Sequence, residues 1–128
     1  MTDKYYLTPV ELELMDILWK LDEGTVHDVL AKLPSARLLA YTSVSTMLRI
    51  LQQKKILGIK KVGRQHIYYP LLNKETYAMH SLNKIVQRIF SGKSAELVAH
   101  LVDKNRLSID EISALQQLLD SKKKELAE

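Results

Sequence analysis

The sequence predicts a mainly α-helical protein with one small β-hairpin. Apolar residues recur at helical spacing in several separate segments. β-branched and aromatic residues at 57–71 surround a glycine at a position that suits a tight turn. A chain of 128 residues, 46% of them hydrophobic, is long enough to form a core without disulfides, and it contains no cysteine.

A first helix is expected to begin after Thr8. Thr8 is a candidate N-cap, Pro9 suits the first helical position, and Glu11 completes a capping box. Gly24 is expected to end the region as a left-handed helix cap. Trp19 is interpreted as a core residue. The apolar face of this helix contains Val10, Leu14, Ile17, Leu18 and Leu21.

Two more helices follow closely. The first is expected to begin at Thr25, which forms a capping pattern with Asp28, and to end before Pro34. After a short connection at 35–40, residues 41–55 are expected to form the next helix. Its apolar face contains Val44, Met47, Leu48 and Leu51. Two short helices before a third are typical of a helix-turn-helix arrangement.

The opposite face of the third helix favours contact with DNA. It carries Thr42, Ser45, Thr46, Arg49 and Gln53, without an acidic residue. Arginine can hydrogen-bond to guanine, glutamine to adenine, and serine or threonine to either. The alternative is an ordinary surface helix with polar residues outside. A glycine would be expected where this helix ends, but Lys54 and Lys55 stand there.

The charges are distributed unevenly along the chain, whose net charge is +4. Residues 1–28 are acidic overall, and residues 75–128 are balanced. The interval between Asp28 and Glu75 has no acidic residue, which favours a phosphate-binding face. The alternative is a solubilising surface, although such surfaces usually mix both signs. The nine basic residues of the interval are Lys32, Arg37, Arg49, Lys54, Lys55, Lys60, Lys61, Arg64 and Lys74.

Residues 57–62 and 66–71 are expected to pair as a hairpin around Gly63. Pro70 places the second strand at an edge or near its end. Basic side chains at or near the tip indicate a wing that reaches phosphates or the minor groove beside the third helix. The alternative is a hairpin that only covers the core. The expected electrostatic contacts to DNA are Lys54, Lys60, Lys61 and Arg64, and His66 lies close to the tip.

The second half of the chain predicts three further helices. They begin near Asn73, Ser94 and Ser108, and Ser108 forms a capping box with Glu111. Each has an apolar face but too few residues to bury it alone, so burial against a second copy is expected. The alternative is packing against the first half of the same chain. The predicted dimer interface comprises Leu82, Ile85, Val86, Ile89, Phe90, Leu97, Val98, Leu101, Ile112, Leu115 and Leu119.

With these features, the chain resembles the penicillinase and methicillin-resistance repressors of the BlaI/MecI/CopY type. The resemblance implies a winged helix-turn-helix DNA-binding domain at 1–72, a short three-helix dimerisation domain at 73–128, and a homodimeric transcriptional repressor. By position, the DNA-reading helix falls on Tyr41, Thr42, Ser43, Ser45, Thr46 and Arg49, and the wing on Gly63 and Arg64, with Tyr69 before Pro70. The matching segments are LTPVELELMDILW (7–19), TVHDVL (25–30), AYTSVSTMLRILQQKK (40–55), GRQHIYYP (63–70) and FSGKSAELVAHLVDKNRLSIDEI (90–112).

The chain departs from this family in three places. The glycine usual near the end of the third helix is Lys55 here. The copper-responsive branch carries a C-terminal cysteine cluster, which this sequence lacks. The antibiotic-responsive branch is induced by cleavage of an Asn-Phe bond, and the matching pair is His100-Leu101. His100 and Leu101 are therefore the candidate regulatory cleavage position, and the scissile dipeptide itself is not kept.

The sequence thus predicts a sequence-specific repressor that binds a palindromic operator as a homodimer. The expected partners are double-stranded DNA, a second copy, and a sensor protease or another inducing partner. The alternative is a winged-helix module that binds an acidic protein. The sequence has no G-x-S-x-G elbow, P-loop or H-E-x-x-H motif, and its four histidines lack ligand spacing, so no enzyme, metal or cofactor is expected. No apolar segment suits a secretory signal or a membrane span, and a cytoplasmic location is expected.

Overall fold

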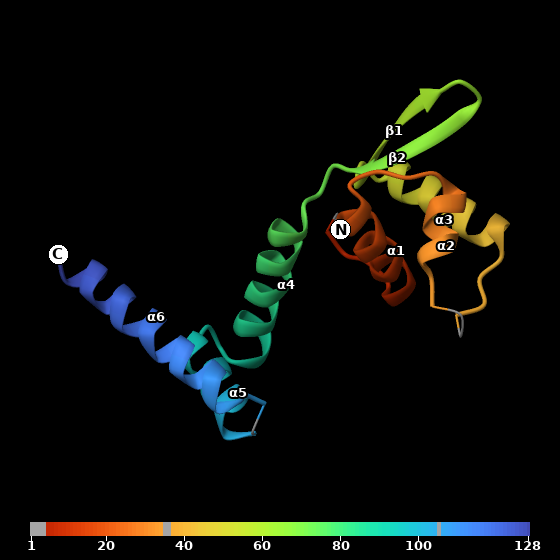
Figure 1. Ribbon diagram of the computed structural model, residues 1–128. Helices are drawn as coiled ribbons and strands as arrows, with labels where there is room; N and C mark the ends of the chain where they lie inside the picture. Colours follow the sequence, from red (N-terminus) through yellow and green to blue (C-terminus); the bar gives the residue numbers. More distant parts are fainter. Residues whose placement is uncertain (1–4, 35–36, 105) are drawn as a thin grey trace. The chain divides into compact units, whose positions relative to one another are not determined.

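The computed structural model describes residues 5–34, 37–104 and 106–128; residues 35–36 of the predicted connection lie outside the described residues. The described residues form six helices and one antiparallel hairpin, which confirms the predicted fold class (Figure 1). The elements are α1 (Pro9–Leu21), α2 (Val26–Lys32), α3 (Tyr41–Gln53), β1 (Leu57–Val62), β2 (Gln65–Pro70), α4 (Lys74–Ile89), α5 (Ser94–Asp103) and α6 (Ile109–Ala127).

The chain divides into two compact units. The first ends at Ser81 and the second begins at Leu82, so the division falls within α4. The domain boundary expected between residues 72 and 73 stays a prediction. No helix of the described residues is long and apolar enough to cross a membrane.

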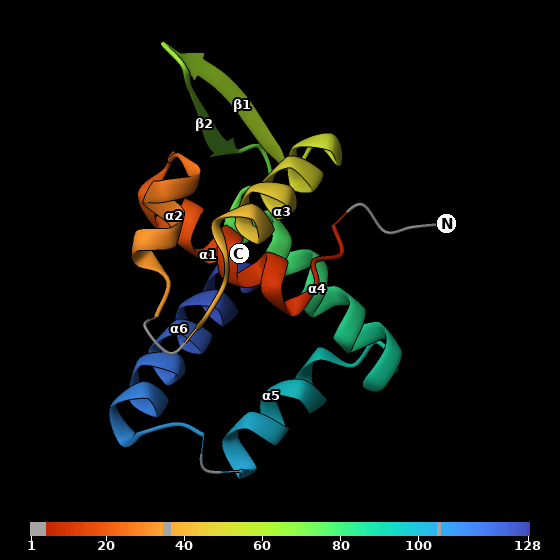
Figure 2. The same cartoon turned by 90° about the vertical axis from the view of Figure 1, so that its right-hand side faces the viewer.

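The core of the first unit lies between α1, α2, α3 and the base of the hairpin. Its fully buried side chains come from all of these elements except β2, which contributes the nearly buried Tyr68. The hairpin extends beyond the three helices (Figure 2). The largest fully buried side chains are Leu14, Met15, Leu18, Val29, Val44, Leu48, Leu51 and Leu57.

Local capping hydrogen bonds fix where the helices begin. The backbone N–H of Glu11 donates to Oγ1 of Thr8 (3.2 Å), and that of Thr8 donates to the Glu11 carboxylate (2.9 Å). Thr25 and Asp28 form the same reciprocal pair at the start of α2, with distances of 3.1 and 2.9 Å. The capping boxes predicted for α1 and α2 are therefore confirmed.

The turn after α1 differs from the prediction. Gly24 is not the left-handed residue; Asp22 is, with φ of 70°. Gly24 forms an isolated antiparallel bridge to Tyr68, whose two backbone hydrogen bonds measure 2.9 and 2.8 Å. The expected cap at Gly24 was wrong because pairing with β2 keeps this residue extended.

The end of α3 also differs from the prediction. The helix ends at Gln53 rather than at Lys55, and Lys55 adopts φ of 64°, the conformation usually taken by glycine. The N–H of Ile56 then donates to the carbonyl of Leu51 (3.0 Å), which closes the helix end. Gly58 has another role, because a side chain there would overlap the ring of Tyr69.

The hairpin has a two-residue turn. Val62 pairs with Gln65, so β2 begins one residue earlier than expected and ends at Pro70. Gly63 has φ of 62°, which confirms its predicted role in the turn.

Trp19 belongs to the core region of the first unit, as expected. Its indole N–H donates to the carbonyl of Leu72 (2.9 Å), and its ring lies 5.9 Å from that of Tyr77. This hydrogen bond connects α1 to the segment that leads into α4.

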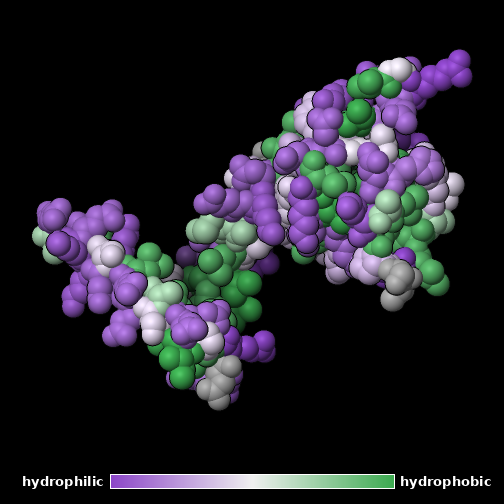
Figure 3. All heavy atoms as spheres, in the orientation of Figure 1, coloured by the Kyte–Doolittle hydropathy of each residue, from purple (hydrophilic) through white to green (hydrophobic). Residues whose placement is uncertain are grey.

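The second unit has almost no buried interior of its own. Among its described residues, Val86 is the one buried apolar side chain. Figure 3 shows hydrophobic residues at the surface of this part of the chain. Ser108 and Glu111 form the predicted capping box at the start of α6. The exposed apolar residues predicted for a dimer interface are Leu82, Ile85, Ile89, Val98, Leu101, Ile112, Leu115 and Leu119.

We expect Lys55→Gly to stabilise the protein by about 1 kcal/mol or less. Glycine removes the steric cost of positive φ at this position, and the greater entropy of the unfolded glycine offsets part of that gain. Urea unfolding measures the difference. Lys54→Gly is the matched control and should destabilise, because Lys54 has a negative φ of −76°, at which glycine relieves no strain, and its ion pair with Glu11 is lost. Destabilisation by Lys55→Gly would show that the steric cost of positive φ at this residue is smaller than the entropy that glycine adds to the unfolded chain.

Candidate nucleic-acid interface

The burial of one face of α3 determines which side chains face outward. Val44, Leu48 and Leu51 are fully buried. Most of the predicted DNA-reading residues are exposed, and Ser45 is half-buried. The exposed members of that set are Tyr41, Thr42, Ser43, Thr46 and Arg49.

The hairpin presents its cations on two different faces. Lys61 is paired with His66 and Lys60 with Ile67. Because cross-strand partners share a face and neighbouring residues alternate, Lys61 and His66 lie on one face and Lys60 on the other. The predicted set of wing cations is therefore not a single patch.

Two of the predicted DNA-contacting lysines have carboxylate partners within the chain. Nζ of Lys54 lies 3.3 Å from Oε2 of the nearly buried Glu11. Nζ of Lys60 lies 2.9 Å from Oε1 of Glu23. Within the described part of the chain, Arg49, Lys61 and Arg64 form no ion pair. Of the predicted DNA-contacting cations, these three have no carboxylate partner among the described residues and are available to an external anion.

A cavity of about 250 Å³ lies between α2, α3 and the hairpin, and we call it the notch. It brings three predicted residues together: Tyr41, Ser45 and Arg64. The sequence analysis did not predict the contribution of Thr25, Val26 and His27. No pattern in the sequence relates the start of α2 to the hairpin. The notch is lined by Thr25, Val26, His27, Tyr41, Ser45, Arg64, Gln65, His66 and Tyr68.

Aromatic contacts and burial define the walls of the notch. The rings of His27 and Tyr41 lie 4.7 Å apart, which joins α2 to the start of α3. Burial raises the pKa of the Tyr68 phenol, while the positive charge of Arg49 acts in the opposite direction. Tyr68 therefore stays a neutral hydroxyl in this wall at neutral pH.

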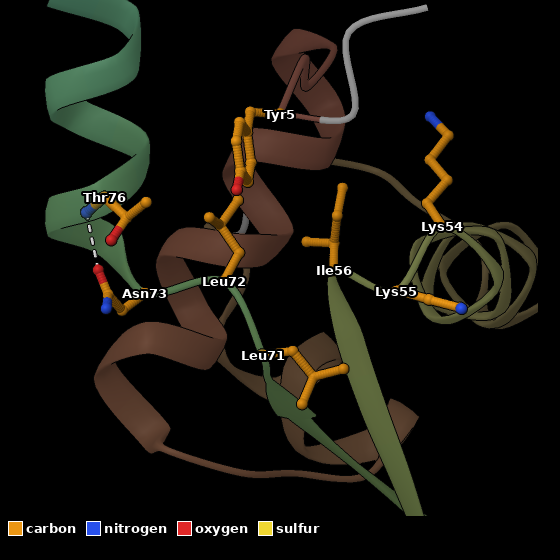
Figure 4. Close-up of a pocket in the computed structure, with 8 residues that line it drawn as sticks. All are labelled: Tyr5, Lys54, Lys55, Ile56, Leu71, Leu72, Asn73 and Thr76. Atoms are coloured by element: carbon orange, nitrogen blue, oxygen red, sulfur yellow. Dashed lines mark hydrogen bonds between the residues drawn. The ribbon is translucent and has the colours of Figure 1, made fainter.

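A second cavity of about 300 Å³ lies where α3, the base of the hairpin and the start of α4 meet. Figure 4 shows Lys54 and Lys55 extending away from the apolar side chains of Ile56, Leu71 and Leu72. Oδ1 of Asn73 accepts a hydrogen bond from the N–H of Thr76 (2.7 Å), which confirms Asn73 as the cap of α4. The remaining lining residue is Tyr5. The described lining has no histidine or carboxylate.

No group of histidine and carboxylate side chains in the described ranges could hold a metal ion. His100, one residue of the candidate cleavage position, lies within α5, and its ring is 5.3 Å from that of Phe90. Leu101 follows it in the same helix and is 45% exposed.

An apolar cavity of about 600 Å³ lies on the second unit, along α5 and α6. Four of its residues belong to the predicted dimer interface: Val98, Ile112, Leu115 and Leu119. The others extend that surface beyond the sequence prediction: Val102, Leu107, Gln116 and Leu118.

Comparison with known proteins identifies the family. The family model described as penicillinase repressor matches residues 7–121. The chain belongs to the penicillinase repressor family. This confirms the resemblance inferred from the sequence, and the match includes both units of the chain.

Relatives of this repressor-family chain match over most of their length. The penicillinase repressor of Bacillus licheniformis is 26% identical over 117 residues, 91% of each chain. The transcriptional regulator BlaI of Mycobacterium tuberculosis (strain CDC 1551 / Oshkosh) is 33% identical over 115 residues, 88% of this chain and 82% of that protein. The methicillin resistance regulatory protein MecI of Mammaliicoccus sciuri is 24% identical over 118 residues, 92% of this chain and 96% of that protein.

Two solved structures of repressor-family proteins resemble part of the chain. The solution structure of the DNA-binding domain of the repressor BlaI has a TM-score of 0.52 and 27% identity, covering 60% of this chain and 94% of its own. The solution structure of monomeric Bacillus licheniformis BlaI in complex with the blaP half-operator has a TM-score of 0.50, with the same identity and coverages.

We expect Asp28→Ala to destabilise this repressor-family chain at neutral pH but not at low pH. Hydrogen bonds from the backbone and side chain of Thr25 lower the pKa of Asp28. Its stabilising effect is therefore complete above the unfolded value of about 3.9 and lost as the pH falls through the lower folded value. Thermal unfolding at a series of pH values measures the difference in melting temperature between the Asp28→Ala variant and the unmodified protein.

Asp120→Ala is the control for this experiment, since the side chain of Asp120 forms no hydrogen bond or ion pair with a described residue. It should leave the melting temperature nearly unchanged at every pH. If the melting temperature of Asp28→Ala stayed below that of the unmodified protein by the same amount down to the lowest pH, the role assigned to the ionised carboxylate would be contradicted.

Proposed function

We propose that this chain is a sequence-specific DNA-binding transcriptional repressor that acts as a homodimer on a palindromic operator. Family membership supports repression, and the BlaI half-operator complex supports DNA as the ligand. A repressor of this kind acts in the cytoplasm, where bacterial DNA is accessible.

The exposed stripe of α3 is the observation that carries this proposal. Thr42, Thr46 and Arg49 are exposed on a helix whose opposite face is buried. A helix of this kind fits the major groove, where arginine and hydroxyl side chains reach base edges. No acidic residue lies between Asp28 and Glu75 to repel the phosphates. In this proposal α3 reads bases, and the available cations Lys61 and Arg64 contact the backbone.

Lys54 and Lys60 have a smaller role in the proposed complex than the sequence suggested. Each must leave a carboxylate partner before it can neutralise a phosphate. We therefore assign specificity first to Arg49 and non-specific affinity first to Lys61 and Arg64.

The second unit supports the homodimer. Its helices carry apolar side chains that the described chain leaves exposed, and α5 and α6 form an apolar cavity. Burying apolar surface contributes roughly 25 cal/mol per Å². We propose that a second copy covers this surface, with the domains divided at about residue 72. A two-fold dimer would place two α3 helices on the half-sites of a palindrome.

We expect Arg49→Ala to weaken binding to a preferred sequence by about 1–3 kcal/mol and to relax the preference at one base pair. The preferred duplex can be obtained by selection from a random pool with the unmodified protein. Fluorescence anisotropy then compares the selected duplex with a scrambled one. Equal loss on both duplexes would show that Arg49 contacts only the backbone.

Lys61→Ala should weaken binding to all duplexes alike and reduce the slope of log affinity against log salt by about one. Lys60→Ala is the matched control on the neighbouring position. It should change the slope less, because Lys60 is neutralised by Glu23. If the unmodified protein bound no duplex DNA even at low salt, the module that binds an acidic protein would become the better interpretation.

We expect Leu115→Glu to convert the dimer into a monomer at micromolar concentration. The charge would lie inside the apolar cavity, where its desolvation is costly. Leu126→Glu is the matched control on α6, at an exposed position outside that cavity. Sedimentation equilibrium measures the mass of each variant. A Leu115→Glu protein that remained dimeric would rule out this face as the interface.

A further inference from the structure

We propose that the notch between α2, α3 and the hairpin binds a backbone phosphate of the bound DNA, and that His27 and His66 make this contact depend on protonation. The inference rests on the proposed DNA-binding function. It gives the place where Arg64 contacts the DNA backbone, beside the α3 residues proposed to read bases, and adds a pH dependence to that contact.

The chemistry of the notch suits an anion. Its lining contains the guanidinium of Arg64, two imidazoles, the Gln65 amide and several hydroxyl groups, and no carboxylate. Its volume of about 250 Å³ admits a phosphodiester group with its bridging oxygens. Arg64 has no ion-pair partner among the described residues, so its charge is available to the ligand.

The position of the notch fits a phosphate next to the bases that α3 reads. Ser45 belongs both to the α3 stripe and to the wall of the notch. Lys61 lies opposite His66 on the same face of the hairpin. A DNA strand that lies along α3 would therefore bring one of its phosphates to the notch, between α2 and the hairpin.

The histidines face mainly neutral and positive groups. On the hairpin these are Arg64, Lys61 and the neutral Tyr68, and on α3 it is Tyr41. Arg49, also on α3, acts on Tyr68.

Two carboxylates lie near the start of α2, and both are engaged. Asp28 accepts the N–H of Thr25 (2.9 Å), and Glu23 pairs with Lys60 (2.9 Å). His27 exerts only the smallest of the effects that lower the pKa of Asp28. Both carboxylates therefore have partners other than the two imidazoles.

A phosphate bound in the notch would place a negative charge beside both imidazoles. Its negative charge favours the protonated imidazoles, so DNA binding takes up protons. A complex that holds more protons than its free components becomes more stable as the pH falls. Affinity for DNA should therefore increase as the pH falls through the range where histidine titrates.

The test measures binding to a duplex of arbitrary sequence, because non-specific affinity reports phosphate contacts. Fluorescence anisotropy with a duplex of about 20 base pairs, at about pH 6 and about pH 8, gives affinity across a salt series. We expect the unmodified protein to bind about 3- to 10-fold more tightly at the lower pH. Its salt slope should be steeper there, by about one for each histidine that contacts a phosphate.

The variants are His27→Gln, His66→Gln and the double variant. Glutamine can still donate a hydrogen bond but does not gain a proton. Both histidines are exposed, so folding should be retained, which circular dichroism can verify. Each single variant should lose part of the pH effect and the double variant all of it. His100→Gln is the control in the second unit and should keep the full effect.

The outcomes separate this inference from the function it depends on. Binding that is tight but independent of pH would overturn the inference and leave the repressor proposal intact. A pH effect that persists in the double variant would overturn the assignment to His27 and His66. Absence of binding to any duplex at low salt would contradict the proposed function, and the inference with it.

Discussion

The burial of one face of α3 is the constraint on which the proposed interface depends. Val44, Leu48 and Leu51 are fully buried in the same core as α1 and α2. Turning the helix about its axis would expose these side chains, at a cost of roughly 1.5–3 kcal/mol each. The outward direction of Thr42, Thr46 and Arg49 is thus fixed by packing on the opposite side.

The bridge between Gly24 and Tyr68 has a comparable effect on the notch. Its two backbone hydrogen bonds fasten the turn before α2 to β2. Tyr68 is nearly buried, so the hairpin is anchored at this residue while its tip extends outward. As a consequence, the start of α2 and the turn of the hairpin share one cavity. The same bridge explains why Gly24 is extended rather than left-handed.

The two units use their apolar residues in opposite ways. In the first unit these residues pack against one another, and the polar stripe of α3 remains outside. In the second unit nearly every described apolar side chain remains accessible, although its helices are capped and regular. A chain that forms good helices without an interior is suited to association. This contrast supports the proposal that the first unit binds DNA and the second unit binds a second copy of the chain.

The sequence by itself determined the helices, the hairpin turn and the exposed polar face of α3, because these depend on interactions between residues a few positions apart. The Thr8–Glu11 and Thr25–Asp28 caps and the positive φ of Gly63 are of this kind. Only the tertiary structure paired Lys54 with Glu11 and brought His27 to the hairpin. These residues lie far apart in the sequence. Their contact depends on how the core packs, and no local sequence pattern predicts that packing.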